Sequence, residues 1–192
     1  HSAQFFKDQL FIADLGKNTL EHYTFKDSSY ATKQTILITK KSGPRHFEIT
    51  KNAEFIYVIN EYGGTISRLV KQGNMYVKKN DISTLGENYK GKNSCADIHL
   101  SQDEKFIYGS NRGENTIVVF ERNKKDGTLK KVQSISSHGN WPRNFTLGPK
   151  GNFLLVANKK TDNIAIFLVD KGSGELTYIY DVRSPNPTCL KF

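Results

Sequence analysis

Several short motifs along the chain carry side chains that could bind an anion and move a proton. Arginine presents a planar fork of N–H donors that suits a phosphate, a carboxylate or a developing oxyanion. Carboxylates and histidines can accept a proton or orient a water molecule near neutral pH. The candidates are Arg45, His46, Glu61, Asp97, His99, Arg112 and Arg143. Their types predict a site for a small anionic molecule, with Arg45, Glu61 and Arg112 as the first choices.

These candidates lie in a sequence pattern that repeats along the chain. Its anchors are separated by 46, 51 and 47 residues, and an aliphatic residue follows each anchor six positions later; the anchors are Asp14, Asn60, Asn111 and Asn158. Pro44 and Pro142 each precede their anchor by 16 residues. A period of about 40 to 50 residues, built from short apolar runs and turn signals, is typical of the blades of a β-propeller.

Each repeat contains four predicted strands. In the second repeat they cover about 47–50, 55–60, 65–70 and 75–82, and the fourth is the most polar, as expected of an outer edge. Turns rich in Asp, Asn and Gly separate the strands, and no helical periodicity is present. We therefore predict one all-β domain over 1–192, a β-propeller with four four-stranded blades. The blades cover about 1–40, 41–85, 91–136 and 140–184, and 185–192 form a further, closing strand.

Strand direction predicts where the candidate residues lie. Successive strands are antiparallel, so the entry to the first strand and the loop after the second strand share one end of each blade. Every candidate except His99, which lies within the first strand, falls in one of these two segments. The first strand is the innermost of a blade. We expect the candidates to surround the mouth of a central channel, where this architecture usually binds ligands.

Structural roles compete with these functional interpretations. An arginine such as Arg45 could pair with a neighbouring glutamate and hold two blades together. His99 could point into the core between blades, and Asp97 could cap a turn. An asparagine that recurs in three blades is more typical of loop architecture than of substrate contact.

Composition limits the function classes. The chain has 28 basic and 19 acidic residues and a net charge of +9, which favours anionic partners. Its lysines are scattered among turns, so we expect no nucleic-acid site, and no apolar run is long enough for a membrane span. The two cysteines, Cys95 and Cys189, lie in different repeats, so we expect free thiols in a reducing compartment.

Known catalytic motifs of other classes are absent. The sequence lacks the Gly-x-Ser-x-Gly, Cys-x-x-Cys and His-Glu-x-x-His patterns of serine hydrolases, zinc ribbons and zincins. A calcium site would need several oxygen ligands, and the nearby arginines disfavour a cation. We expect no metal and no cofactor.

The repeated motifs resemble those of the seven-bladed lactonase family, which includes propeller-type 6-phosphogluconolactonases and fungal carboxymuconate cyclases. The motifs are Gly43-Pro44-Arg45-His46, Ile59-Asn60-Glu61, Ser110-Asn111-Arg112-Gly113, Trp141-Pro142-Arg143-Asn144-Phe145 and Pro185-Asn186-Pro187-Thr188-Cys189-Leu190-Lys191-Phe192. The resemblance implies that about three blades precede His1. It also implies a cleft formed by His1, Arg45, Glu61 and Arg112. Beside these we predict His46, Asp97, His99 and Arg143 as substrate-binding residues. The fourth repeat departs from the pattern, since Asn158-Lys159 stands where the second has Asn60-Glu61.

The resulting hypothesis is a cytoplasmic, metal-independent lactonase for an anionic sugar lactone. The resemblance implies 6-phosphogluconolactone as the substrate, in the pentose phosphate pathway. Two alternatives remain open: a carboxymuconate-type cyclase or lactonase, and a propeller that binds a partner without catalysis, because fold alone does not determine function.

Overall fold

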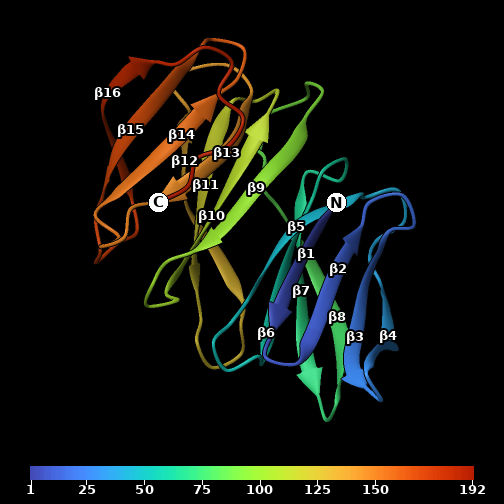
Figure 1. Cartoon of the computed structure of the whole chain (residues 1–192). Coiled ribbons are helices and arrows are strands. Elements are labelled where there is room, and N and C mark those ends of the chain that lie inside the picture. The colour runs from blue at the N-terminus through green and yellow to red at the C-terminus, as the bar shows by residue number, and fades with distance from the viewer.

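The computed structural model describes residues 1–192 and contains 16 β-strands in four antiparallel sheets (Figure 1). The first sheet comprises β1 (Ser2–Phe6), β2 (Gln9–Asp14), β3 (Thr19–Lys26) and β4 (Ser29–Leu37), and the second comprises β5 (Pro44–Ile49), β6 (Phe55–Asn60), β7 (Thr65–Gln72) and β8 (Met75–Ser83). The third comprises β9 (Ser94–Leu100), β10 (Phe106–Arg112), β11 (Thr116–Arg122) and β12 (Leu129–Ser136), and the fourth comprises β13 (Pro142–Leu147), β14 (Phe153–Asn158), β15 (Asn163–Val169) and β16 (Leu176–Arg183). No helix of the structure is long and apolar enough to cross a membrane. The predicted all-β fold with four four-stranded blades is confirmed.

The sheets pack face to face in chain order, with their first strands next to one another. Strand β5 contacts β1 and β9, and β9 also contacts β13 (Figure 1). A separate apolar core fills each of the three spaces between neighbouring sheets. All six residues of β6 are buried, whereas the outer strand β8 alternates between exposed and covered positions. This gradient explains why the second strand of each repeat is apolar and the fourth is polar.

A repeated tyrosine–glycine contact joins neighbouring sheets. The hydroxyl of Tyr57 donates to the carbonyl of Gly127 over 2.7 Å, and that of Tyr108 donates to Gly174 over 3.0 Å. Both tyrosines are fully buried, so each hydroxyl needs such an acceptor. Each glycine has a positive φ and lies against a phenylalanine ring of the preceding sheet.

Three of the four first strands contain a β-bulge at the same place. The register shifts between Pro44 and His46 in β5, and between Pro142 and Asn144 in β13. In the third sheet the shift lies between Gly109 and Asn111, opposite β9. A bulge bends the strand and redirects side chains. Here it determines the positions of the candidate residues.

Residues 185–192, predicted as a closing strand, form no strand in this structure. A strand needs a hydrogen-bonded neighbour, and this segment pairs with none of the four sheets. It does follow the path of a first strand, because the Leu190 N–H donates to Asn144 Oδ1 over 2.6 Å. The equivalent contact one sheet earlier is that of the Phe145 N–H with Asp97. The predicted register of Pro187 with Pro44 and Pro142 agrees with this contact.

The glycine contact between sheets gives a test of the packing. A Cβ at Gly174, where φ is +77°, would lie 2.4 Å from the Phe106 ring. We expect Gly174→Ala to reduce the free energy of unfolding of the complete protein by about 2–4 kcal/mol, from backbone strain and overpacking. Gly73→Ala is the matched control, since φ is +60° and a Cβ there would meet nothing within 4 Å. It should cost only about 1 kcal/mol. Equal losses for the two variants in urea unfolding would contradict this packing.

Candidate functional site

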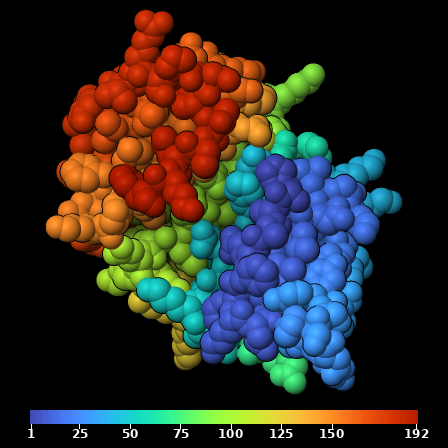
Figure 2. Space-filling view, in the orientation of Figure 1, coloured from blue at the N-terminus to red at the C-terminus, as the bar shows by residue number.

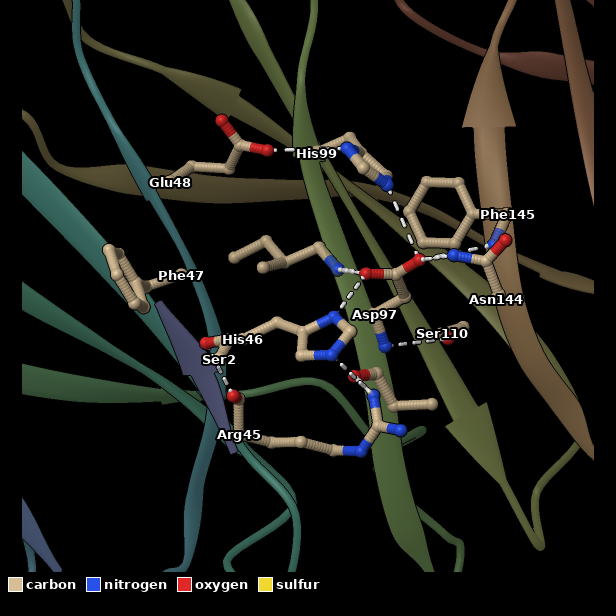
Figure 3. A network of polar contacts seen from close by, with 12 residues as sticks. Ser2, Arg45, His46, Phe47, Glu48, Asp97, His99, Ser110, Asn144 and Phe145 are labelled. Atoms are coloured by element: carbon tan, nitrogen blue, oxygen red, sulfur yellow. Dashed lines mark hydrogen bonds and ion pairs between the residues drawn. The ribbon is translucent and has the colours of Figure 1, made fainter. Parts of the chain in front are cut away.

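The bulges align side chains of three neighbouring first strands in one row. His46 of β5, Asp97 of β9 and Asn144 of β13 occupy equivalent places after the bulge. They bond to one another across the sheets: His46 Nδ1 lies 2.6 Å from Asp97 Oδ1, and Asn144 Nδ2 donates to Asp97 Oδ2 (Figure 3). One repeat position therefore supplies a continuous polar contact across three blades.

Asp97 is the centre of this row. Its side chain is 2% exposed and accepts five hydrogen bonds, from the side chains of His46, His99 and Asn144 and from the backbone N–H groups of Ile98 and Phe145 (Figure 3). Burial alone would raise the pKa of Asp97, but the hydrogen bonds from the two histidines lower it far below its usual value. Asp97 is thus a buried, fully engaged carboxylate.

The two histidines bound to Asp97 have different second partners. His46 Nε2 lies 3.2 Å from Arg45 Nη1, whereas His99 Nδ1 lies 3.2 Å from Glu48 Oε1. Burial disfavours the charged form of His99, but the bonds to Asp97 and Glu48 outweigh it and raise its pKa to about 10. His99 is therefore a cation at neutral pH. The side chains of His46 and His99 are 28% and 34% exposed, so both reach the surface.

Glu61, directly after β6, lies between two arginines. Its Oε2 is 3.1 Å from Arg45 Nε, and its Oε1 is 2.9 Å from Arg112 Nη2. The Arg45 contact is an ion pair without an aligned hydrogen bond. The arginine side chains are 3% and 5% exposed, and Glu61 is 16% exposed. The carboxylate is the more accessible member of this cluster.

The arginines also join the second and third sheets. Arg112 donates to the Ser94 carbonyl and hydroxyl over 3.0 and 2.9 Å and to the Cys95 carbonyl over 3.0 Å. Arg45 donates across the interface to the carbonyl of Ala96. Burial, followed by the charge of Arg112, lowers the pKa of Arg45 to about 10, so it stays charged at neutral pH. The arginines thus hold two blades together, as the structural alternative predicts. They also lie beside Glu61.

The remaining predicted residues lie at the same inner end. The ring of His1 is tilted against that of His46, with 5.1 Å between centroids. Arg143 occupies the bulge of β13, is partly buried and makes no ion pair or hydrogen bond. Two cations lie over the ring of Trp141: its centroid is 5.3 Å from the Arg112 guanidinium carbon and 3.6 Å from Lys160 Nζ. Figure 2 shows the first sheet (blue) and the C-terminal segment (red) on opposite sides, with parts of the second and third sheets (cyan and green) between them.

Asp97, which the sequence predicted as a substrate-binding residue, is bound by groups of the protein instead. Its oxygens are buried and occupied by five donors, so they are not available to a ligand. The recurring Asn60, Asn111 and Asn158 are completely buried and bond within or beside their loops, as a repeat-wide structural role predicts.

Sequence reasoning missed Glu48, Ser94 and Asn144. Glu48 follows His46 by two residues, and His99 follows Asp97 by two, so alternation along a strand could have placed this pair on one face. Aligning the repeats would also have set Asn144 beside His46 and Asp97. No group of three or more His, Cys, Asp or Glu side chains is arranged to hold a metal ion.

Four-stranded antiparallel sheets packed face to face, with polar side chains gathered at the innermost strands, define a β-propeller. The family model "Lactonase, 7-bladed beta-propeller" matches residues 1–192. The chain belongs to this family, as its motifs predict.

Two relatives of this chain carry the name 6-phosphogluconolactonase. A 6-phosphogluconolactonase of Formosa agariphila is 37% identical over 92% of this chain and 52% of its own length. A 6-phosphogluconolactonase of Bacillus subtilis is 31% identical over 100% of this chain and 56% of its own length. The chain thus spans about half the length of the curated relatives that it matches.

Solved structures agree with the fold. The periplasmic gluconolactonase of Pseudomonas aeruginosa superposes with a TM-score of 0.92 at 26% identity, over 100% of this chain and 56% of that one. A protein from Lactobacillus plantarum gives a TM-score of 0.93 at 30% identity, over 98% of this chain and 57% of that one.

The charge of His99 predicts a pH-dependent contribution to stability. The pKa of His99 is higher in the folded protein than the value of about 6.5 for an unfolded histidine. Protonation therefore favours the folded state, fully below about pH 6.5, and this contribution is lost as the pH rises through about 10. We expect the difference in thermal midpoint between the wild type and His99→Gln to shrink across that range.

The same series in His138→Gln, whose ring stacks on Tyr178 and contacts no carboxylate, provides the baseline. A wild-type advantage over His99→Gln that grows as the pH rises from 6.5 to 10 would refute the charge assigned to His99.

Proposed function

We propose that the complete protein is a metal-independent lactonase that needs no cofactor and hydrolyses an anionic sugar lactone. The observation that carries the proposal is the cluster of Glu61, Arg45 and Arg112 beside an accessible histidine, in a chain of the lactonase family. The names of the relatives support 6-phosphogluconolactone as substrate and 6-phosphogluconate as product, a step of the pentose phosphate pathway.

The geometry suits the steps of lactone opening. A water oxygen attacks the carbonyl carbon, and the carbonyl electron pair moves onto its oxygen. When that pair returns, the ring C–O bond breaks, and the proton lost by the water ends on the leaving oxygen as a hydroxyl group. Negative charge develops on the carbonyl oxygen, and nearby cations stabilise it. Arg45 and Arg112 supply that positive field, and Glu61 between them orients the polar groups of the substrate.

Arg143 is the best candidate for binding the anionic group of the substrate. It is the arginine at this end that makes no ion pair, so its fork of donors is free for a phosphate. The contact of the His1 ring with the His46 ring supports a place for His1 in the same cleft. The net charge of +9 attracts such a substrate over longer distances.

We also propose that further blades of the same protein cover the two terminal sheets. Large apolar side chains are exposed on the first sheet and on the fourth: Phe5, Phe25, Tyr30, Leu37, Phe153, Leu168, Ile179, Tyr180 and Val182. Exposed apolar patches of this kind usually mark contact surfaces. The seven blades in the family description, against four sheets here, support the same proposal, as does Leu190 in the register of a first strand.

A cytoplasmic location completes the proposal. Cys95 and Cys189 are both free, one buried and one exposed, which suits a reducing compartment. Cell fractionation of the native organism tests this directly, and recovery of the protein outside the cytoplasm would refute it.

The phosphate assignment can be tested by comparing two substrates. Arg143→Gln should raise the KM of the complete protein for 6-phosphogluconolactone by about tenfold or more, because a charged hydrogen bond is lost. Its KM for glucono-δ-lactone, which has no phosphate, should change little. Arg183→Gln, at an exposed position at the end of β16, is the matched control. Equal effects of Arg143→Gln on both substrates would refute a phosphate contact.

The activity itself is tested with folded wild type and Glu61→Gln, with and without a chelator, against spontaneous hydrolysis. We expect chelator-resistant turnover that falls about 100-fold in Glu61→Gln, because the field around the carbonyl changes. No turnover above background by the wild type would refute the lactonase. In that case, turnover of a carboxylated diene would favour the cyclase. Binding of a ligand without turnover would favour the non-catalytic scaffold.

A further inference from the structure

The contacts of His46 determine where its proton lies. An ionised carboxylate only accepts hydrogen bonds, so Nδ1, which is 2.6 Å from Asp97 Oδ1, carries the proton. A guanidinium only donates, so Nε2, which is 3.2 Å from Arg45 Nη1, carries the lone pair. The groups that face His46 are Asp97, Arg45 and the ring of His1. They select the tautomer with its proton on Nδ1 and its lone pair on Nε2.

The other candidates for a base are already engaged. Both nitrogens of His99 face carboxylates, Asp97 on one side and Glu48 on the other, so both carry protons. Both oxygens of Glu61 face arginines. His46 differs from them in that its Nε2 faces no carboxylate. The Nε2 lone pair accepts from Arg45 Nη1 over 3.2 Å, and a water molecule takes the place of that donor when the proton is transferred.

We propose that His46 is the proton acceptor that activates water in the lactonase site, and that Asp97 is the residue that positions it. The inference rests on the proposed function and adds the residue roles within it. Asp97 cannot touch the substrate, because its oxygens are buried and occupied. It acts through His46, by fixing the tautomer and the orientation of the ring.

His46 takes up one proton and releases it again within each reaction cycle. His46 Nε2 takes one proton from water while the water oxygen forms a bond to the carbonyl carbon, and the carbonyl electron pair moves to its oxygen. When that pair returns, the ring C–O bond breaks, and the leaving oxygen takes the proton from His46 Nε2. The histidine ends neutral, in its initial tautomer. Asp97 stays ionised throughout and stabilises the transient imidazolium.

Nitrogen NMR of the complete protein, labelled with ¹⁵N-histidine, tests the tautomer without substrate. The signals are assigned by their loss in His46→Gln and His99→Gln. We expect His46 at pH 7 to be neutral with its proton on Nδ1, and His99 to be protonated on both nitrogens. In Asp97→Asn, where the amide N–H can face the ring, the proton of His46 should move to Nε2. A neutral His46 with the proton on Nε2 in the wild type, or a doubly protonated one, would overturn the proposal.

Kinetics test the catalytic role. His46→Gln should lower kcat by at least about 100-fold, as expected for loss of a general base, with a smaller change in KM. It should also remove the acid limb of the pH profile of kcat/KM. His99→Gln should keep that limb, and Asp97→Asn should lower kcat while the protein stays folded. His138→Gln, in the loop between β12 and β13, is the control for replacing a histidine.

The outcomes separate this inference from the proposed function. If the wild type hydrolyses a lactone and His46→Gln keeps the acid limb and most of kcat, the lactonase stands and the role of His46 is wrong. If the wild type hydrolyses no lactone, the proposed function fails and the catalytic role of His46 fails with it. The NMR result then still reports whether Asp97 fixes the tautomer.

Discussion

The arrangement of this site depends on one buried carboxylate. An ionised Asp97 inside the protein would cost several kcal/mol if its oxygens were unpaired. Five donors from the second, third and fourth sheets satisfy it, and they hold β5, β9 and β13 in one relative position. The same contacts orient His46 and keep His99 charged. Stability and chemistry are therefore coupled at Asp97, since a change that unpairs it disturbs both the packing of the blades and the site.

The repeats place equivalent backbone positions of neighbouring sheets at the same end of the structure, and the residue types at these positions differ from sheet to sheet. The place after the bulge holds His46, Asp97 and Asn144 in successive sheets, and the bulge itself holds Arg45, Ala96 and Arg143. The small side chain of Ala96 leaves its carbonyl accessible to Arg45 of the neighbouring sheet. The residue after the recurring asparagine is Glu61 in the second sheet and Arg112 in the third, and these opposite charges form the ion pair between blades. Identical backbones thus present different functional groups to one central region.

The sequence pattern predicted the fold well, because the repeat period, the apolar second strands and the turn residues are local signals. It also placed the candidate residues at one end, since strand direction requires this. The sequence pattern could not predict the burial of Arg45 and Arg112 or the hydrogen bonds that occupy Asp97. Both depend on how far one blade is offset from the next. Residues 185–192 show the same limit: their composition resembles a first strand, but a strand also needs a partner.

A crystal structure of the complete protein with bound 6-phosphogluconate would test the central claim most directly, namely that the chemistry takes place at His46 beside the Asp97 contacts. The account predicts the carboxylate of this product within about 3 Å of His46 Nε2, with its phosphate on Arg143. Asp97 should keep its protein partners and make no contact with the product. A product bound away from the first strands, or one whose carboxylate lies nearer to His99 than to His46, would contradict the account.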